Sequence, residues 1–125
     1  MPNWQPNWNN VRWDWGAANA ASAALRRSAD KLDAFAHERS RVAGDAQREW
    51  RGRYRQEFDQ QFQVTLNRSA QLAAEMRHAA GRIDQASSRA REEQRHRERE
   101  RERWYREKYE EDRRREEEER RRRDG

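Results

Sequence analysis

The sequence predicts an all-α protein: an antiparallel two-helix hairpin that turns at Trp50-Gly52 and continues into a charged helical tail. Two long segments carry apolar or small residues three and four positions apart, the spacing of one helix face. Trp50-Arg51-Gly52 lies between them, where the chain must turn. Only 32% of the 125 residues are hydrophobic and 42% are charged, so we expect one thin helical domain without a thick globular core.

Residues 1–13 are predicted to form an irregular, Trp-rich segment. Pro2-Asn3-Trp4 is echoed by Pro6-Asn7-Trp8, and Pro and Asn at this density favour turns and extended backbone. Two interpretations remain open for the indoles here. They cover the open end of a helical bundle, or they form a docking peptide or a membrane-interface anchor.

The hairpin is predicted over residues 14–90, and its first arm runs from Asp14 to Ala46. Asp14 is a suitable N-cap. Small and apolar residues then alternate three and four positions apart, with one interruption at Arg39. They are Ala18, Ala21, Leu25, Ser28, Leu32, Phe35 and Val42.

The second arm repeats this spacing without a break, which strongly indicates a helix. Its positions are Phe58, Phe62, Thr65, Ser69, Leu72, Met76, Ala79, Ile83, Ala86 and Ala90. A fold at residue 51 places Val42 near Phe58 and Phe62, and Leu25 near Met76.

The large residues of both arms are the expected core of the hairpin or of its dimer. They are Leu25, Leu32, Phe35, Val42, Phe58, Phe62, Leu66, Leu72, Met76 and Ile83. Two helices alone leave the far side of each apolar stripe in water, so we expect a second hairpin to complete a four-helix bundle.

Residues 91–125 are predicted to continue the helix as a Glu/Arg-rich tail. Glu–Arg pairs four positions apart recur along it, and each stabilises a helix by about 0.2–0.5 kcal/mol. Trp104, Tyr105 and Tyr109 are its only large apolar residues and form a candidate docking spot. Alternatively, they pack against the Trp-rich N-terminus of a neighbour, or the tail is simply a solvated helix.

Catalysis and cofactor binding find no support in the sequence. There is no cysteine, and the heptad register keeps His37, His78 and His96 too far apart to share a metal. The carboxylates lie in Arg-rich exposed segments, where no pocket concentrates them. We therefore expect no enzyme, no cofactor and no metal site.

The charge distribution argues against nucleic acid as a partner, although the net charge is +5. Residues 91–125 hold 15 Lys or Arg and 14 Asp or Glu, so no one-signed block tracks a phosphate backbone. The N-terminal region lacks the basic and apolar segments of a signal peptide, and no stretch has the length of a membrane span. A secreted form would use a leaderless route.

The chain resembles the WXG proteins, small helical hairpins of the type VII secretion system of Gram-positive bacteria. The resemblance covers roughly residues 15–90 and rests on Trp50 and Gly52, on Tyr54 and Phe58, and on the Ala-rich first arm. It implies a homodimer or heterodimer that is exported folded after residing in the cytoplasm. It also implies a role as secreted substrate or as targeting partner of an effector, with a secretion ATPase as a possible partner.

One feature of that family differs here. Its members or their partners typically carry Tyr-Xaa-Xaa-Xaa-Asp/Glu after the second helix, whereas Tyr105 is followed four positions later by Tyr109, and Tyr109 by Arg113. A partner carries the signal, the signal is degenerate, or the chain is not itself exported. The alternative function is a cytoplasmic coiled-coil scaffold with a charged helical spacer.

Overall fold

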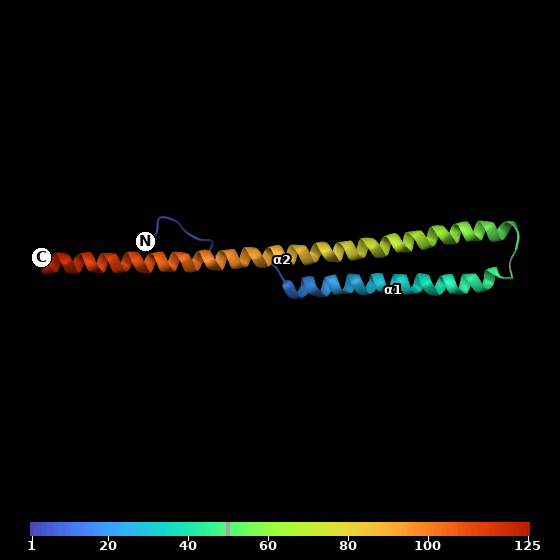
Figure 1. Ribbon diagram of the computed structural model, residues 1–125, viewed down its shortest axis with the longest axis horizontal. Coiled ribbons are helices and arrows are strands. Elements are labelled where there is room, and N and C mark those ends of the chain that lie inside the picture. Colours follow the sequence, from blue (N-terminus) through green and yellow to red (C-terminus); the bar gives the residue numbers. More distant parts are fainter. Residues whose placement is uncertain (50) are drawn as a thin grey trace. The chain divides into compact units, whose positions relative to one another are not determined.

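The computed structural model describes residues 1–49 and 51–125 and contains two α-helices (Figure 1). Helix α1 spans Trp15–Gln47 and helix α2 spans Arg53–Asp124. No strand occurs in these residues, so the all-α prediction is confirmed. The chain divides into two compact units, Asp14–Ala86 and a discontinuous unit of Met1–Trp13 with Ser87–Gly125, and α2 contributes to both.

The start of α1 agrees with the sequence prediction. Asp14 has extended backbone dihedrals, and its carboxylate accepts a hydrogen bond of 2.9 Å from the backbone N–H of Ala17. This contact satisfies one of the N–H groups that the first helical turn leaves unpaired. Asp14 is therefore the N-cap, as predicted.

The connection between the helices contains the one glycine with a left-handed backbone among the described residues. Gly52 has φ +113°, a conformation that side chains with a Cβ rarely adopt, and it immediately precedes α2. The predicted turn at Trp50-Gly52 is thus supported at Gly52. Trp50 lies outside the described residues.

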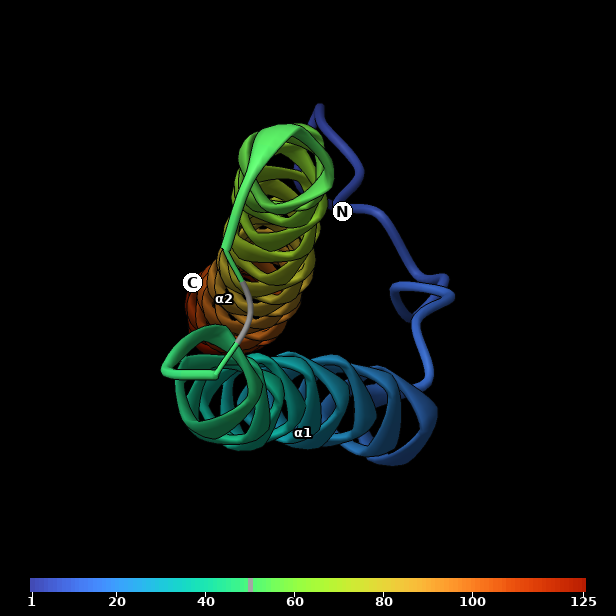
Figure 2. The same cartoon turned by 90° about the vertical axis from the view of Figure 1, so that its right-hand side faces the viewer.

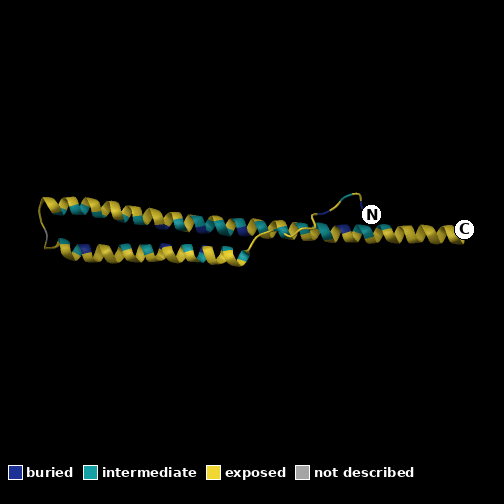
Figure 3. Ribbon diagram, turned by 180° about the vertical axis from the view of Figure 1, so that it is seen from behind, coloured by how far each residue is buried: buried dark blue, intermediate teal, exposed yellow. Residues whose placement is uncertain are grey.

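Helices α1 and α2 lie side by side in the hairpin unit (Figures 1 and 2). Their contact is made by small residues, four of which are alanines with at most 7% exposure. These four define the alanine seam: Ala29, Ala43, Ala73 and Ala80. Ser22 is also buried, and Figure 3 shows the buried positions on the facing sides of the helices.

The alanine seam corrects the predicted core. Phe35, Val42 and Leu72 are exposed in the single chain, so they are not hairpin core, and their place in a dimer core stays a prediction. The other large residues predicted there are only half-buried: Leu25, Leu32, Phe58, Phe62, Leu66, Met76 and Ile83. Small residues allow two helices to approach closely, which displaces larger side chains to the edges of the contact.

Ion pairs across the hairpin show how the two helices are aligned. Arg26 Nη2 lies 2.7 Å from Asp84, and Arg77 Nη2 lies 2.9 Å from Asp30 and 2.6 Å from Asp33. Hydrogen bonds to Asp30 and Asp33 raise the pKa of Arg77. Solvent screens these exposed pairs, so they contribute little to stability, but they record an antiparallel alignment.

The observed alignment differs from the predicted one. Leu25 was expected beside Met76. Arg77, which follows Met76 in the sequence, instead pairs with Asp30 and Asp33. The arms are therefore displaced by about one to two turns relative to a fold centred on residue 51. The prediction matched large residues with large ones, whereas the small residues of the seam determine the alignment.

The remainder of α2 and the N-terminal segment form the second unit. We call Met1–Trp13 the strap and residues 87–124 of α2 the tail helix. The strap contains neither helix nor strand, and the tail is helical to Asp124, as predicted for both. The predicted division into residues 1–13, 14–90 and 91–125 treated them as separate segments, whereas they form one compact unit.

We expect enlargement of a seam residue to destabilise the hairpin. Ala73→Leu inserts a larger side chain where the alanine is 0% exposed, so it should cost about 1–3 kcal/mol of unfolding free energy. The control is Ala74→Leu, at an exposed position of the same helix. Urea unfolding followed by circular dichroism measures both. Equal stability of the two variants would contradict the seam.

Candidate interaction surfaces

An apolar groove lies beside the turn, between the end of α1 and the start of α2. Its apolar lining consists of Phe35, Val42, Ala43, Ala46, Phe58 and Phe62, and its volume is about 400 Å³. The predicted proximity of Val42 to Phe58 and Phe62 is therefore confirmed.

The aromatic rings of the groove are ordered by local contacts. Phe58 and Phe62, one helical turn apart, stack with centroids 5.7 Å apart and an interplanar angle of 10°. The Arg39 guanidinium lies 4.6 Å from the centroid of Phe35. Phe35 is nevertheless 58% exposed and Val42 is 55% exposed. The groove thus presents a large apolar surface to solvent.

The rim of the groove carries both signs of charge. Glu38 and Arg39 line it, and Arg41 lies 2.6 Å from the carboxylate of Glu38. The hydrogen bond from Arg41 lowers the pKa of Glu38, so this carboxylate is ionised at neutral pH. A second hollow, lined by Ser28, Lys31, Leu32 and Phe35, continues the apolar surface along α1.

The second surface is the contact between the strap and the tail helix. Trp104 is only 6% exposed, and the ring of Trp8 meets it edge-on at 5.2 Å between centroids. Trp8 also lies 5.7 Å from Tyr105. Such edge-to-face pairs contribute about 0.5–1.5 kcal/mol beyond the area they bury. An aromatic cluster therefore anchors the strap.

Trp4 is held at both its side chain and its main chain. Its indole Nε1 donates a hydrogen bond of 2.5 Å to Glu107, and its carbonyl accepts one of 3.0 Å from Trp104 Nε1. The Arg103 guanidinium lies 4.2 Å from the Trp4 ring centroid. Cation–π contacts of this kind contribute about 0.5–1 kcal/mol at exposed sites.

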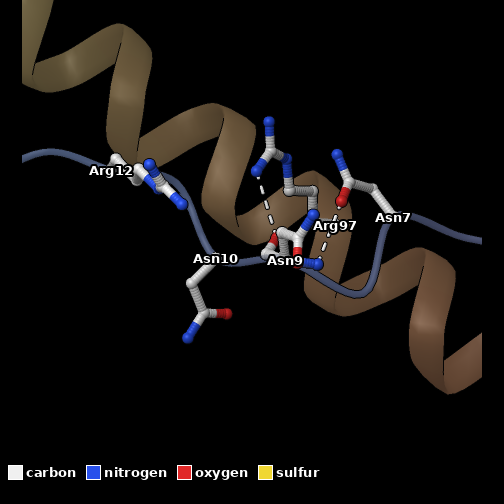
Figure 4. Close-up of a pocket in the computed structure, with 5 residues that line it drawn as sticks. All are labelled: Asn7, Asn9, Asn10, Arg12 and Arg97. Atoms are coloured by element: carbon white, nitrogen blue, oxygen red, sulfur yellow. Dashed lines mark hydrogen bonds between the residues drawn. The ribbon is translucent and has the colours of Figure 1, made fainter.

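Two arginines of the tail helix bind main-chain carbonyls of the strap. Arg101 donates to the carbonyl of Asn7 at 3.0 Å and to that of Asn9 at 2.8 Å, and Arg97 donates to Asn9 at 3.1 Å. The Asn7 side chain accepts from the Asn9 N–H, which tightens the bend that presents these carbonyls (Figure 4). Asn7, Asn9 and Arg97 also line a polar hollow together with Asn10 and Arg12, all of which Figure 4 shows.

The strap is extended along the tail helix and antiparallel to it. Trp13 Nε1 donates to Ser87 Oγ at 3.0 Å, and the Val11 N–H donates to Gln94 at 2.8 Å. Between the contacts Trp13–Ser87 and Trp4–Glu107, nine strap positions match twenty helix positions. At about 3.1 Å per extended residue and 1.5 Å per helical residue, both distances come to about 30 Å. An extended segment has no regular backbone–backbone hydrogen bonds of its own, so side chains of the helix pair with several of its main-chain groups.

These contacts change the interpretation of the predicted docking residues. Trp104 is not open for docking, because the strap of its own chain covers it, whereas Tyr105 and Tyr109 are exposed. Trp104 was expected to contact the Trp-rich N-terminus of a neighbouring molecule, but it contacts the N-terminal segment of its own chain. A signal for this was present in the sequence. Arg97 and Trp104, seven and fourteen positions after Ala90, continue the heptad spacing of the second arm.

The described residues contain no group of three or more His, Asp or Glu side chains placed to bind a metal ion. Within the same part of the chain, neither helix combines the length and hydropathy needed to cross a bilayer. No family model, no curated protein and no solved structure matches this chain.

Loss of Arg101 should loosen the strap. Arg101→Ala removes the hydrogen bonds to two strap carbonyls, and we expect roughly tenfold faster amide hydrogen exchange in the strap. Arg99→Ala is the matched control, since Arg99 is an exposed neighbour on the same helix. Unchanged exchange in Arg101→Ala would show that the carbonyl contacts do not hold the strap.

Proposed function

We propose that this chain is a helical-hairpin interaction protein of the WXG type, acting in type VII secretion as a substrate or as the targeting partner of an effector. The observation that carries the proposal is the open apolar groove beside the turn. The groove exposes apolar side chains that the two helices of one chain leave uncovered, and such a surface is suited to binding another protein. Dimerisation through the groove is the first step of the proposed mechanism.

A second copy of the chain fits the groove in shape and charge. In a twofold dimer, each groove meets the same surface of its partner. Glu38 and Arg39 stand next to one another on the rim, so a twofold axis can place each opposite the unlike charge of the other copy. Phe35 and Val42 would then be covered by their equivalents. Two such hairpins make a four-helix bundle with the large residues inside.

The secretion role is supported by the residues around the turn. Gly52 adopts a backbone that favours glycine, and Phe58 takes part in the groove one to two turns later. Tyr54 is exposed and available to a partner. The missing Tyr-Xaa-Xaa-Xaa-Asp/Glu signal is consistent with export as a heterodimer in which an effector supplies it. The secretion ATPase would recognise the complex through that effector.

The alternative function is a cytoplasmic scaffold in which α2 is a spacer. The observation in its favour is the length of α2, whose 72 residues run without interruption to Asp124. Pairs such as Glu93–Arg97 at 3.0 Å support the helix along its exposed surface. This function requires a rigid α2 but no export.

Disruption of the groove should abolish dimerisation. Val42→Glu places a charge in the apolar lining of the groove that the second copy would have to desolvate, so we expect the dimer dissociation constant to rise at least roughly a hundredfold. Val64→Glu is the control, because Val64 is exposed outside the groove. Sedimentation equilibrium measures both. A wild-type chain that stays monomeric alone and with its effector would contradict the proposal.

Export is tested by comparing culture supernatants of the native host and of a strain lacking the secretion ATPase. We expect the chain in the wild-type supernatant only, with a cytoplasmic marker absent from both. The chain should also vanish from the wild-type supernatant when Val42→Glu prevents dimerisation. Release independent of the ATPase, or retention in the cell with candidate effectors co-expressed, would favour the scaffold.

A further inference from the structure

We propose that the strap site on the tail helix is a peptide-binding site that also accepts the strap of a second copy, so that two chains exchange straps. The strap and its site lie in one unit, apart from the groove, so the proposal does not depend on groove-mediated dimerisation. The ligand is an extended segment carrying the repeated Pro-Asn-Trp motif.

The site recognises both the main chain and the indoles of its ligand. Arg101 and Trp104 bind carbonyls, which any extended segment offers, and therefore determine the path of the backbone. Selectivity comes from the indoles. Trp4 reaches Glu107 with its N–H, and Trp8 fits against Trp104 at the aromatic cluster. A segment without tryptophan at both positions would lose these contacts.

The strap is held in a way that permits release. Pro2 and Pro6 are its only buried residues, Trp8 is 44% exposed, and the carbonyl contacts of Arg101 lie at the surface. Ordering an extended segment costs backbone conformational entropy at every residue, which such contacts offset only narrowly. Segments of this kind open locally long before the rest of a protein unfolds.

A second copy is the occupant for which the structure provides direct evidence of fit. When a strap opens, the chain exposes both a free strap and an empty strap site. The free strap fits the empty site of any second copy, and the empty site fits that copy's strap. The contacts made between copies are those already seen within one chain, so exchange requires no new surface. The chain's own strap competes for the site at an effective concentration of about millimolar. Exchange is therefore rare until substitutions weaken either the strap or the site.

Two complementary full-length variants test this proposal. The strap variant carries Trp4→Ala and Trp8→Ala and keeps an intact site, whereas the site variant carries Arg101→Ala and Trp104→Ala and keeps an intact strap. Both also carry Val42→Glu, which removes groove-mediated association. Sedimentation velocity of fluorescently labelled chains should show a one-to-one complex, with a dissociation constant at least roughly tenfold below that of Val42→Glu chains with themselves.

The control pair separates strap exchange from other association. The strap variant mixed with a chain carrying both sets of substitutions should form no complex, because no intact strap is present. If Trp104→Ala lowers the helicity seen by circular dichroism, Arg97→Ala with Arg101→Ala replaces it and leaves the aromatic cluster in place. Absence of the complex between folded complementary variants, or equal association in the control pair, overturns the proposal. Neither result bears on groove-mediated dimerisation, which is measured without these substitutions.

Discussion

The hairpin depends on the close approach of α1 and α2 along the alanine seam. Alanine has no side chain beyond Cβ, so the two helical backbones come near one another and little apolar area is buried per residue. The larger side chains cannot enter such a narrow contact. They lie at its edges, where Phe35 and Val42 remain mostly in solvent. The same constraint that aligns the helices therefore creates the apolar groove.

A different constraint shapes the second unit. The tail helix has few apolar residues, so it cannot bind a neighbour through a hydrophobic face. It instead offers arginine and indole N–H donors to the main-chain carbonyls of the extended strap, and a glutamine carbonyl that accepts from the Val11 N–H. Trp104 adds an apolar centre around which the strap indoles gather. A highly charged helix thus obtains a specific intramolecular ligand.

Much of the architecture could be predicted from local signals. The heptad spacing predicted both helices, Asp14 was recognised as the N-cap, and Glu–Arg pairs predicted the continuous tail. These features depend on residues near one another in the sequence. The turn was also predicted, and the left-handed backbone of Gly52 explains the glycine there.

The alignment of the helices and the strap contact could not be predicted in the same way. Heptad spacing identifies a helix face but does not show which residues approach most closely, and large residues were wrongly preferred over Ala29 and Ala73 for the hairpin core. The strap contact joins residues about a hundred positions apart, such as Trp4 and Trp104. It depends on main-chain carbonyls, which are the same in every sequence.

We propose that the chain binds a second copy through the open groove beside the alanine seam. All three phenylalanines of the chain, Phe35, Phe58 and Phe62, line this groove. Fluorine NMR of fluorophenylalanine-labelled protein with a soluble paramagnetic probe therefore reports on the groove alone. We expect three signals that the probe broadens in dilute protein and that become protected as the concentration rises. Signals that are equally broadened at every concentration, both for the chain alone and for the chain with its effector, would contradict binding through the groove.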